Sequence, residues 1–380
     1  RAVALDFANA AAWKTAQLGA GLYLAGAAPL HYDGYRWAEA DFHAAPDTAT
    51  GALAAVKAGG GSMTVSATYL YRCWYEEIDG AGEIHPGPVT VGTTVVMGGA
   101  DTQVTLTIPT CRLTGKRRVR IGVARSPANQ TGGIDATPFY RVTSTDPAAT
   151  GANGYLLNDA TVDTITFIDQ MSDATLITKE PLYTNGGVSN NAPSSWRGNV
   201  IAGGKARLFW TDSSDPHLVR FSQALRADTG LEAPADLSIR VDPYGGAIVG
   251  LGVLDDVVIV FKETAIYAFG GPGPAAAPAL DPQSGFSPPQ LVTSDCGCKA
   301  ADSIGLTPDG LIFQSEKGIM LLDRTRQLQR IGTPVTAYNA QTVTRTVLLP
   351  DRPYVLLTSA DAGARALGFA RPLFYGLRHA

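Results

Sequence analysis

The chain has 380 residues, of which 45% are hydrophobic and 17% are charged, and its formal net charge is −4. This balance excludes an intrinsically disordered chain and a protein that grips nucleic-acid phosphates through a strongly basic surface. The 42 glycines and 24 prolines lie between short apolar runs, a pattern typical of many tight turns joining many strands. We therefore expect an all-β protein.

Two further features bear on the context of the chain. The longest apolar stretches, residues 247–254 and 257–261, are interrupted by Asp255 and Asp256 and are too short to span a membrane, so we expect no membrane partner. The sequence begins at Arg1 without a methionine or an apolar leader, and its first apolar residues already alternate as on one face of a strand. We interpret it as a fragment or a processed chain.

The chain contains four cysteines, which are too few for a disulfide scaffold in a protein of this size. Cys73 and Cys111 stand in apolar strand contexts and are expected to be buried free thiols. Cys296 and Cys298 are separated by a single glycine, and we expect unreactive thiols there rather than a zinc site, which needs four ligands.

A strand-turn-strand unit recurs four times along the chain. Its copies are residues 22–25 with 30–34, 207–210 with 217–222, 257–261 with 265–270, and 311–314 with 319–323. The last three copies begin about 50 residues apart, close to the repeat length of β-propeller blades. Each unit exposes two apolar faces, which must be buried by stacking on neighbouring units. The repeat therefore predicts a β-propeller.

A segment with a different strand pattern separates the first copy of the strand-turn-strand unit from the second. About seven short alternating strands follow one another, with Trp74 in an early strand and the turn 79–82 after it, as in a fibronectin type III or immunoglobulin-like sandwich. We expect Trp74 to lie in the core of that sandwich. The predicted organisation is a first part of the propeller at 1–42, a linker at 43–61, an inserted sandwich at 62–145, and the remaining blades at 146–380. The strand 164–169 is assigned to the blades, and 354–358 is expected to pair with 366–369.

The densest basic run of the chain lies within the predicted sandwich. It contains Lys116, Arg117, Arg118, Arg120 and Arg125. A nucleic-acid interface is one interpretation; a solvated strand face, or a rim that pairs with carboxylates, is the other, which we favour.

No pattern of catalytic or ligand-binding residues is apparent. The five histidines, which are His31, His43, His85, His217 and His379, show no metal-ligand spacing. The adjacent carboxylates Glu76–Glu77 and Asp255–Asp256 would point to opposite faces of a strand, and we interpret both pairs as solvated turns. We predict no catalytic residue, no metal site and no cofactor, and we expect a protein that is not an enzyme. Four aromatic residues are either anchors for partner proteins or ordinary core residues, and we favour the core: Trp13, Tyr35, Trp37 and Trp196.

Several segments resemble the tail nozzle, or tail tubular, proteins of short-tailed bacteriophages. They are residues 21–26 with 29–34, 71–85 with 118–121, 181–188, 260–267 and 309–315. The resemblance covers most of the chain. It implies a structural virion protein, assembled in the bacterial cytoplasm, that forms a ring around the channel through which DNA leaves during ejection.

The resemblance also implies the partners. They are further copies of the chain in a hexameric ring, an adaptor protein of the tail above it, and fibres at its side, while DNA passes without specific binding. The alternative is a carbohydrate-binding or glycan-hydrolysing β-propeller of a tail or cell-surface protein, since propellers also host lectins and glycosidases. Asp309 and Gly310 beside an aromatic strand are the one feature similar to a sialidase turn, although the Ser and Trp of that motif are missing.

Overall fold

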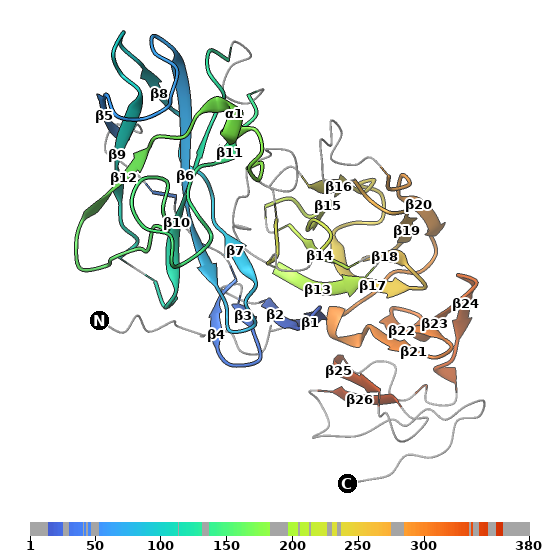
Figure 1. Cartoon of the computed structure of the whole chain (residues 1–380). Helices are drawn as coiled ribbons and strands as arrows, with labels where there is room; N and C mark the ends of the chain where they lie inside the picture. Colours follow the sequence, from blue (N-terminus) through green and yellow to red (C-terminus); the bar gives the residue numbers. More distant parts are fainter. Residues whose placement is uncertain are drawn as a thin grey trace.

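The computed structural model describes most of the chain and shows a nearly all-β protein (Figure 1). The described residues are 14–25, 30–40, 42, 45–46, 53–112, 114–130, 137–182, 197–203, 206–212, 214–225, 230–233, 237–274, 285–333, 336, 342–348 and 355–359. Within them, the one α-helix, α1, spans only Asp173–Leu176, and no helix has the length and apolar character needed to cross a lipid bilayer. The predicted all-β class is confirmed.

Four sheets each consist of four antiparallel strands that pair in chain order. The first contains β1 (Lys14–Leu18), β2 (Gly21–Ala25), β3 (Leu30–Tyr32) and β4 (Trp37–Glu39). The second contains β13 (Arg197–Gly203), β14 (Arg207–Thr211), β15 (Leu218–Phe221) and β16 (Ser238–Arg240). The third contains β17 (Ile248–Leu254), β18 (Val257–Lys262), β19 (Ile266–Gly270) and β20 (Gln290–Thr293). The fourth contains β21 (Gly305–Thr307), β22 (Gly310–Ser315), β23 (Gly318–Asp323) and β24 (Leu328–Arg330).

The four hairpins predicted from the repeat are the central strand pairs of these sheets. They are β2–β3, β14–β15, β18–β19 and β22–β23, so the prediction of the recurring unit is confirmed. Asp255 and Asp256 form the two-residue turn between β17 and β18, and both have positive φ (48° and 64°), as a type I′ hairpin turn requires. The interpretation of this carboxylate pair as an exposed turn is also confirmed.

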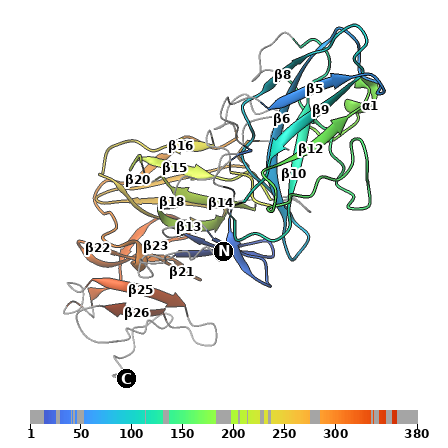
Figure 2. The same cartoon turned by 90° about the vertical axis from the view of Figure 1, so that its left-hand side faces the viewer.

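Successive four-stranded sheets pack against one another through both faces (Figure 2). In β14, Phe209 joins the hydrophobic cluster shared with the third sheet, whereas Leu208 and Trp210 join the cluster shared with the first. In β18, Val260 faces the second sheet and Phe261 faces the fourth. Because neighbouring strand residues point to opposite faces, each middle sheet buries its two apolar faces on two neighbours.

The leading strand of each sheet, which is its first strand in chain order, contacts the leading strand of the next sheet. β1 contacts β13, β13 contacts β17, β17 contacts β21, and β21 contacts β25 (Val343–Leu348). β25 pairs with β26 (Val355–Ser359). The expected pairing of 354–358 with 366–369 stays a prediction, because residues 354 and 366–369 lie outside the described part of the chain. The contact between β1 and β13 joins strands that are far apart in the sequence.

The residues between β4 and β13 form two further sheets, which lie together in the upper left of Figure 1. One contains β6 (Thr68–Ile78), β7 (Ile84–Pro86), β8 (Thr93–Val96), β10 (Val119–Arg125) and β11 (Tyr140–Arg141). The other contains β5 (Ala54–Ala58), β9 (Gln103–Pro109) and β12 (Thr164–Asp169). Both sheets contribute to one hydrophobic cluster, in which Tyr71 and Val123 meet Leu106 and Phe167.

The pairing places the edges of this two-sheet unit differently from the sequence-based boundaries. β5, assigned to the linker 43–61, and β12, assigned to the blades from 146 onward, both pair with β9. β5 (AAVKA) has no apolar alternation, and the alternation of β12 (TITFID) would suit either sheet, so the sequence offered no sign of which sheet they would join.

Trp74 does not lie in the shared core of this unit. Its neighbours Cys73 and Tyr75 face that core, whereas Trp74 packs on the opposite face of β6 with Phe139 and Leu182. The indole covers Gly122, its partner on β10: a Cβ atom built on Gly122 would lie 2.2 Å from Cε2 of Trp74.

Replacing Gly122 with Ala should destabilise the protein, because the added carbon would displace the indole or the strand beneath it. We expect a loss of about 1–3 kcal/mol, the usual cost of overpacking, measured as a lower urea midpoint. Gly99→Ala is the matched control, since a Cβ atom there would meet nothing within 4 Å. Equal midpoints for the two variants would contradict the tight packing of Trp74 on Gly122.

Candidate functional site

A cluster of ligand-type side chains lies where the β6–β7 hairpin meets the first four-stranded sheet. It consists of His31, Asp79, Glu83 and His85. One nitrogen or carboxylate oxygen from each residue lies within 4.8 Å of those of the others. His31 is on β3, Asp79 directly follows β6, Glu83 ends the turn, and His85 is on β7. The cluster thus joins the first sheet to the two-sheet unit that follows it.

The turn of the hairpin fixes the orientation of Asp79. Its Oδ1 atom accepts hydrogen bonds from the backbone amides of Ala81 and Glu83, each at 2.9 Å. Its Oδ2 atom lies 2.9 Å from Nε2 of His85. One carboxylate oxygen therefore holds the turn, while the other faces the cluster.

The two imidazole rings pack against each other in a space that two glycines leave open. The ring centroids of His31 and His85 are 4.7 Å apart, and Tyr23 lies 4.8 Å from His31 on its other side. A Cβ atom on Gly21 would lie 2.4 Å from Nε2 of His31, and one on Gly230 would lie 2.3 Å from Nδ1 of His85. Any larger residue at either glycine would push a ring out of place.

Burial and local charge set the protonation of the cluster. Burial, and then the neighbouring His85, lowers the pKa of His31 to about 4, so this ring is neutral at pH 7. Burial alone would raise the pKa of Asp79, but the hydrogen bond with His85 and the backbone donors hold it below its ordinary value. Burial and the charges of Glu83 and Asp79 raise the pKa of Tyr23. At neutral pH the cluster thus offers a neutral imidazole beside an ionised carboxylate.

Sequence reasoning missed this cluster, because it looked for metal-ligand spacing among the histidines alone. His31 and His85 are far apart in the chain, and only the docking of the hairpin brings them together. A usable signal was present locally: Asp79, Glu83 and His85 flank one predicted turn, so that three donors converge at its base. No sequence pattern pointed to His31 as the fourth.

Buried ion pairs surround the cluster and fasten the hairpin to the first sheet. Glu77 pairs with Arg36 from the first sheet and with Lys116 at 3.0 Å. Asp33, which follows β3, accepts a hydrogen bond from the amide of Gly80 in the turn at 2.6 Å. The side chain of Glu77 is 3% exposed, so the interpretation of Glu76–Glu77 as a solvated turn is wrong.

Glu76 is the centre of a second buried ionic group, on the face of β6 that carries Trp74. It pairs with Arg120 and with Arg141, whose Nη1 lies 3.0 Å from Oε2, and it accepts a hydrogen bond from Nε1 of Trp74 at 2.9 Å. Burial would raise the pKa of Glu76, but the two guanidinium groups hold it below its ordinary value of 4.5.

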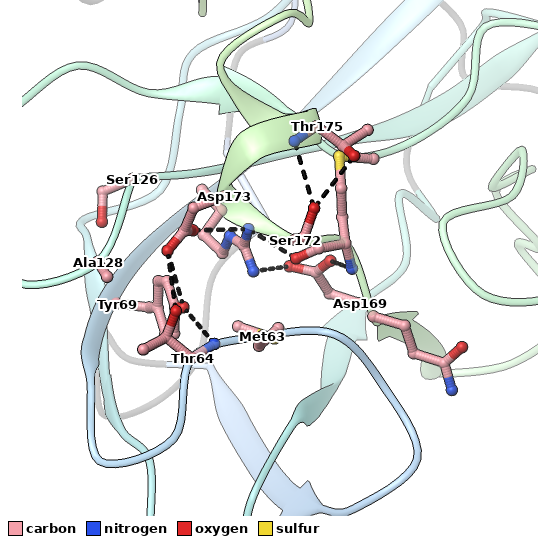
Figure 3. A network of polar contacts seen from close by, with 12 residues as sticks. Met63, Thr64, Tyr69, Ser126, Ala128, Asp169, Ser172, Asp173 and Thr175 are labelled. Atoms are coloured by element: carbon pink, nitrogen blue, oxygen red, sulfur yellow. Dashed lines mark hydrogen bonds and ion pairs between the residues drawn. The ribbon is translucent and has the colours of Figure 1, made fainter.

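Arg125 forms a third group, on the face of β10 that carries the core residues Ile121 and Val123. Its guanidinium lies 3.3 Å from Asp169 and 3.2 Å from Asp173, and 4.6 Å above the ring of Tyr69. Figure 3 shows Asp173 reaching Tyr69, whose hydroxyl is 3.2 Å from it. The side chain of Arg125 is fully buried in this arrangement.

The basic run thus divides into buried and exposed residues. Arg120 and Arg125 pair with carboxylates, as one of the two sequence interpretations expected, whereas Arg117 and Arg118 are exposed. The strand that carries Arg120 is buried along its whole length, so its expected solvated face is wrong.

The remaining sequence candidates do not join the cluster. His217 lies against Lys262, 3.4 Å from its Nζ atom. Tyr35 and Trp37 are exposed at 78% and 48% on the first sheet, so the favoured interpretation of these two as core residues is wrong. His43, His379, Trp13 and Trp196 lie outside the described residues. All four cysteines are free thiols; Cys73, Cys296 and Cys298 are buried and Cys111 is partly so.

Replacing Glu76 with Gln should destabilise the protein strongly at pH 7, because Arg120 and Arg141 would lose their buried counter-charge. We expect about 3–5 kcal/mol, the usual effect of breaking a buried pair, in urea unfolding. Since the pKa of Glu76 is lower in the folded than in the unfolded protein, this stabilisation is present above pH 4.5 and is lost as the pH falls below it. The difference in unfolding free energy between Glu76→Gln and the natural protein should therefore become smaller at acidic pH.

Glu316→Gln is the matched control. Glu316 pairs with Lys299 at 3.7 Å and is 77% exposed, so its loss should change stability by less than about 1 kcal/mol. A Glu76→Gln variant as stable as this control would contradict the buried role of Glu76.

Comparison with protein-family models and with curated protein sequences found no match for this chain. What the site can do is therefore set by its own donor atoms. These are two imidazoles and two carboxylates at the boundary between the first sheet and the β6–β7 hairpin. Such donors suit a divalent metal ion or a hydrogen-bonded structural joint.

Proposed function

We propose that this chain is a structural protein of the tail of a short-tailed bacteriophage, in which several copies form a ring around the DNA exit channel. The observation that carries the proposal is the series of four-stranded antiparallel sheets whose leading strands contact one another in chain order. Such a series supports a β-propeller, in which each sheet is one blade. It adds to the resemblance to tail nozzle proteins found along the sequence.

We further propose that the unit between β4 and β13 is an inserted β-sandwich of the fibronectin type III kind. Its two sheets share one hydrophobic cluster, and β1 contacts β13 across the insertion. An insertion that leaves and re-enters between neighbouring blades would leave the stacking of the blades intact. It would also present a separate surface to neighbouring copies or to tail fibres.

The charges of the chain are compatible with a conduit that does not hold DNA. The net charge is −4, and Arg120 and Arg125 are held in buried ion pairs with carboxylates. Each arginine or lysine that contacted a phosphate would slow the exit of DNA in a salt-dependent way. A single propeller has no central hole wide enough for a duplex, so the conduit would lie between copies around a shared axis.

The purified chain should form closed rings of six copies. Native mass spectrometry and negative-stain electron microscopy measure the copy number and the shape directly. A chain that stays monomeric over a wide range of concentration, and also when mixed with its tail adaptor, would contradict the ring.

The purified protein should also lack glycan-hydrolysing activity. Turnover assays on capsular polysaccharide and peptidoglycan test this, with a commercial lysozyme as the positive control. Reproducible hydrolysis that disappears on replacement of one carboxylate would favour the alternative of a carbohydrate-active propeller.

A further inference from the structure

We propose that a zinc ion binds at the junction of β3 with the β6–β7 hairpin and fastens the two together. Its ligands are His31, Asp79, Glu83 and His85. This site does not depend on the proposed tail function, because it follows from the donor atoms alone.

The geometry is close to that of a bound site. The four donor atoms lie within 4.8 Å of one another. In tetrahedral zinc sites with bonds of about 2.0–2.2 Å, the donor atoms are about 3.4 Å apart. An inward movement of roughly an ångström would therefore complete the coordination.

The carboxylate of Asp79 is already oriented for this role. The amides of Ala81 and Glu83 hold Oδ1, which leaves Oδ2 to the cluster. Backbone donors that fix one oxygen of a ligand carboxylate are the usual outer-shell support of a metal site. Zinc would take the place of the hydrogen bond that now joins Oδ2 to Nε2 of His85.

A purely structural hydrogen-bonded joint does not account for His31. Asp79 and His85 satisfy each other, but Nε2 of His31 is buried and has no hydrogen-bond partner among the described residues. The residue is only 4% exposed. A buried polar atom without a partner costs free energy, whereas coordination of the ring by a metal would compensate for the burial of this residue.

The donor set selects the class of ion. Magnesium and calcium prefer oxygen ligands and would leave both imidazoles unused. Two imidazoles with two carboxylates suit zinc, which is tetrahedral and accepts nitrogen and oxygen together.

The experiment uses the full chain, freed of metal by dialysis against a chelator. Zinc content by mass spectrometry after addition of zinc chloride should reach one ion per chain. The melting temperature should rise with zinc concentration, as for any ligand that binds only the folded state, and should not respond to magnesium chloride. Cobalt(II) chloride should give the visible absorption of a tetrahedral site.

Two variants and one control test the assignment. His31→Phe keeps a ring in the space beside Tyr23 and removes both nitrogens, and Glu83→Gln keeps the shape of a residue that is not fully buried. Each variant should bind zinc at least about 10-fold more weakly. Removing only a residue that supports a metal ligand already costs about 10–100-fold in metal affinity. His217→Gln, outside the cluster, should bind as the natural chain does.

Three results would overturn the proposal. They are less than one zinc ion per chain at saturation, an equal response of the melting temperature to magnesium, and unchanged zinc affinity in Glu83→Gln. If His31→Phe failed to fold, the zinc affinity of Glu83→Gln would test the proposal by itself.

Discussion

Each middle four-stranded sheet has two apolar faces to bury, and the rest of this structure depends on that constraint. A four-stranded sheet such as β17–β20 places Val258 and Val260 on one side and Ile259 and Phe261 on the other. Neither side can face water without a large loss of hydrophobic free energy. The sheet must therefore have a neighbour on each face, and the series of stacked sheets is the consequence.

The junction between the first sheet and the β6–β7 hairpin is stabilised differently from the stacked sheets. It is held by charged and polar groups, including Glu77 with Arg36 and Lys116, and Asp33 with the amide of Gly80. Such groups stabilise little in total, because their desolvation opposes their attraction, but each demands one geometry. Hydrogen bonds are directional, so these contacts restrict the angle between the hairpin and the first sheet more than apolar contacts alone would.

The sequence predicted the parts of the fold that depend on local patterns. The four hairpins could be read from short apolar runs such as 257–261 followed by a polar break, because a run bounded by turn residues is a local property of the sequence. The assignment of β5 and β12 failed because pairing partners are set by distant residues. The sequence predicted Trp74 in the core of the two-sheet unit, but its neighbours Cys73 and Tyr75 face that core instead.

The candidate site also depends on contacts between residues that are distant in the sequence, which local patterns do not predict. Asp79, Glu83 and His85 belong to one hairpin and could have been grouped from the sequence, while His31 joins them only through tertiary docking. The burial of Arg120 and Glu76 was equally out of reach, since charged residues on a strand normally indicate solvent and only the complete fold shows that they neutralise each other.

The contact between β1 and β13 has a consequence for the order of events during synthesis. The first sheet emerges early, but the strand against which β1 packs is about 180 residues further along, which corresponds to on the order of 10–40 s of translation. The unit between them has its own hydrophobic cluster and can fold first. Until β14 (Arg207–Thr211) arrives with Leu208 and Trp210, the apolar face of the first sheet, with Leu18 and Tyr23, lacks residues that cover it in the folded protein, so a nascent chain at this stage is exposed to aggregation and to chaperones.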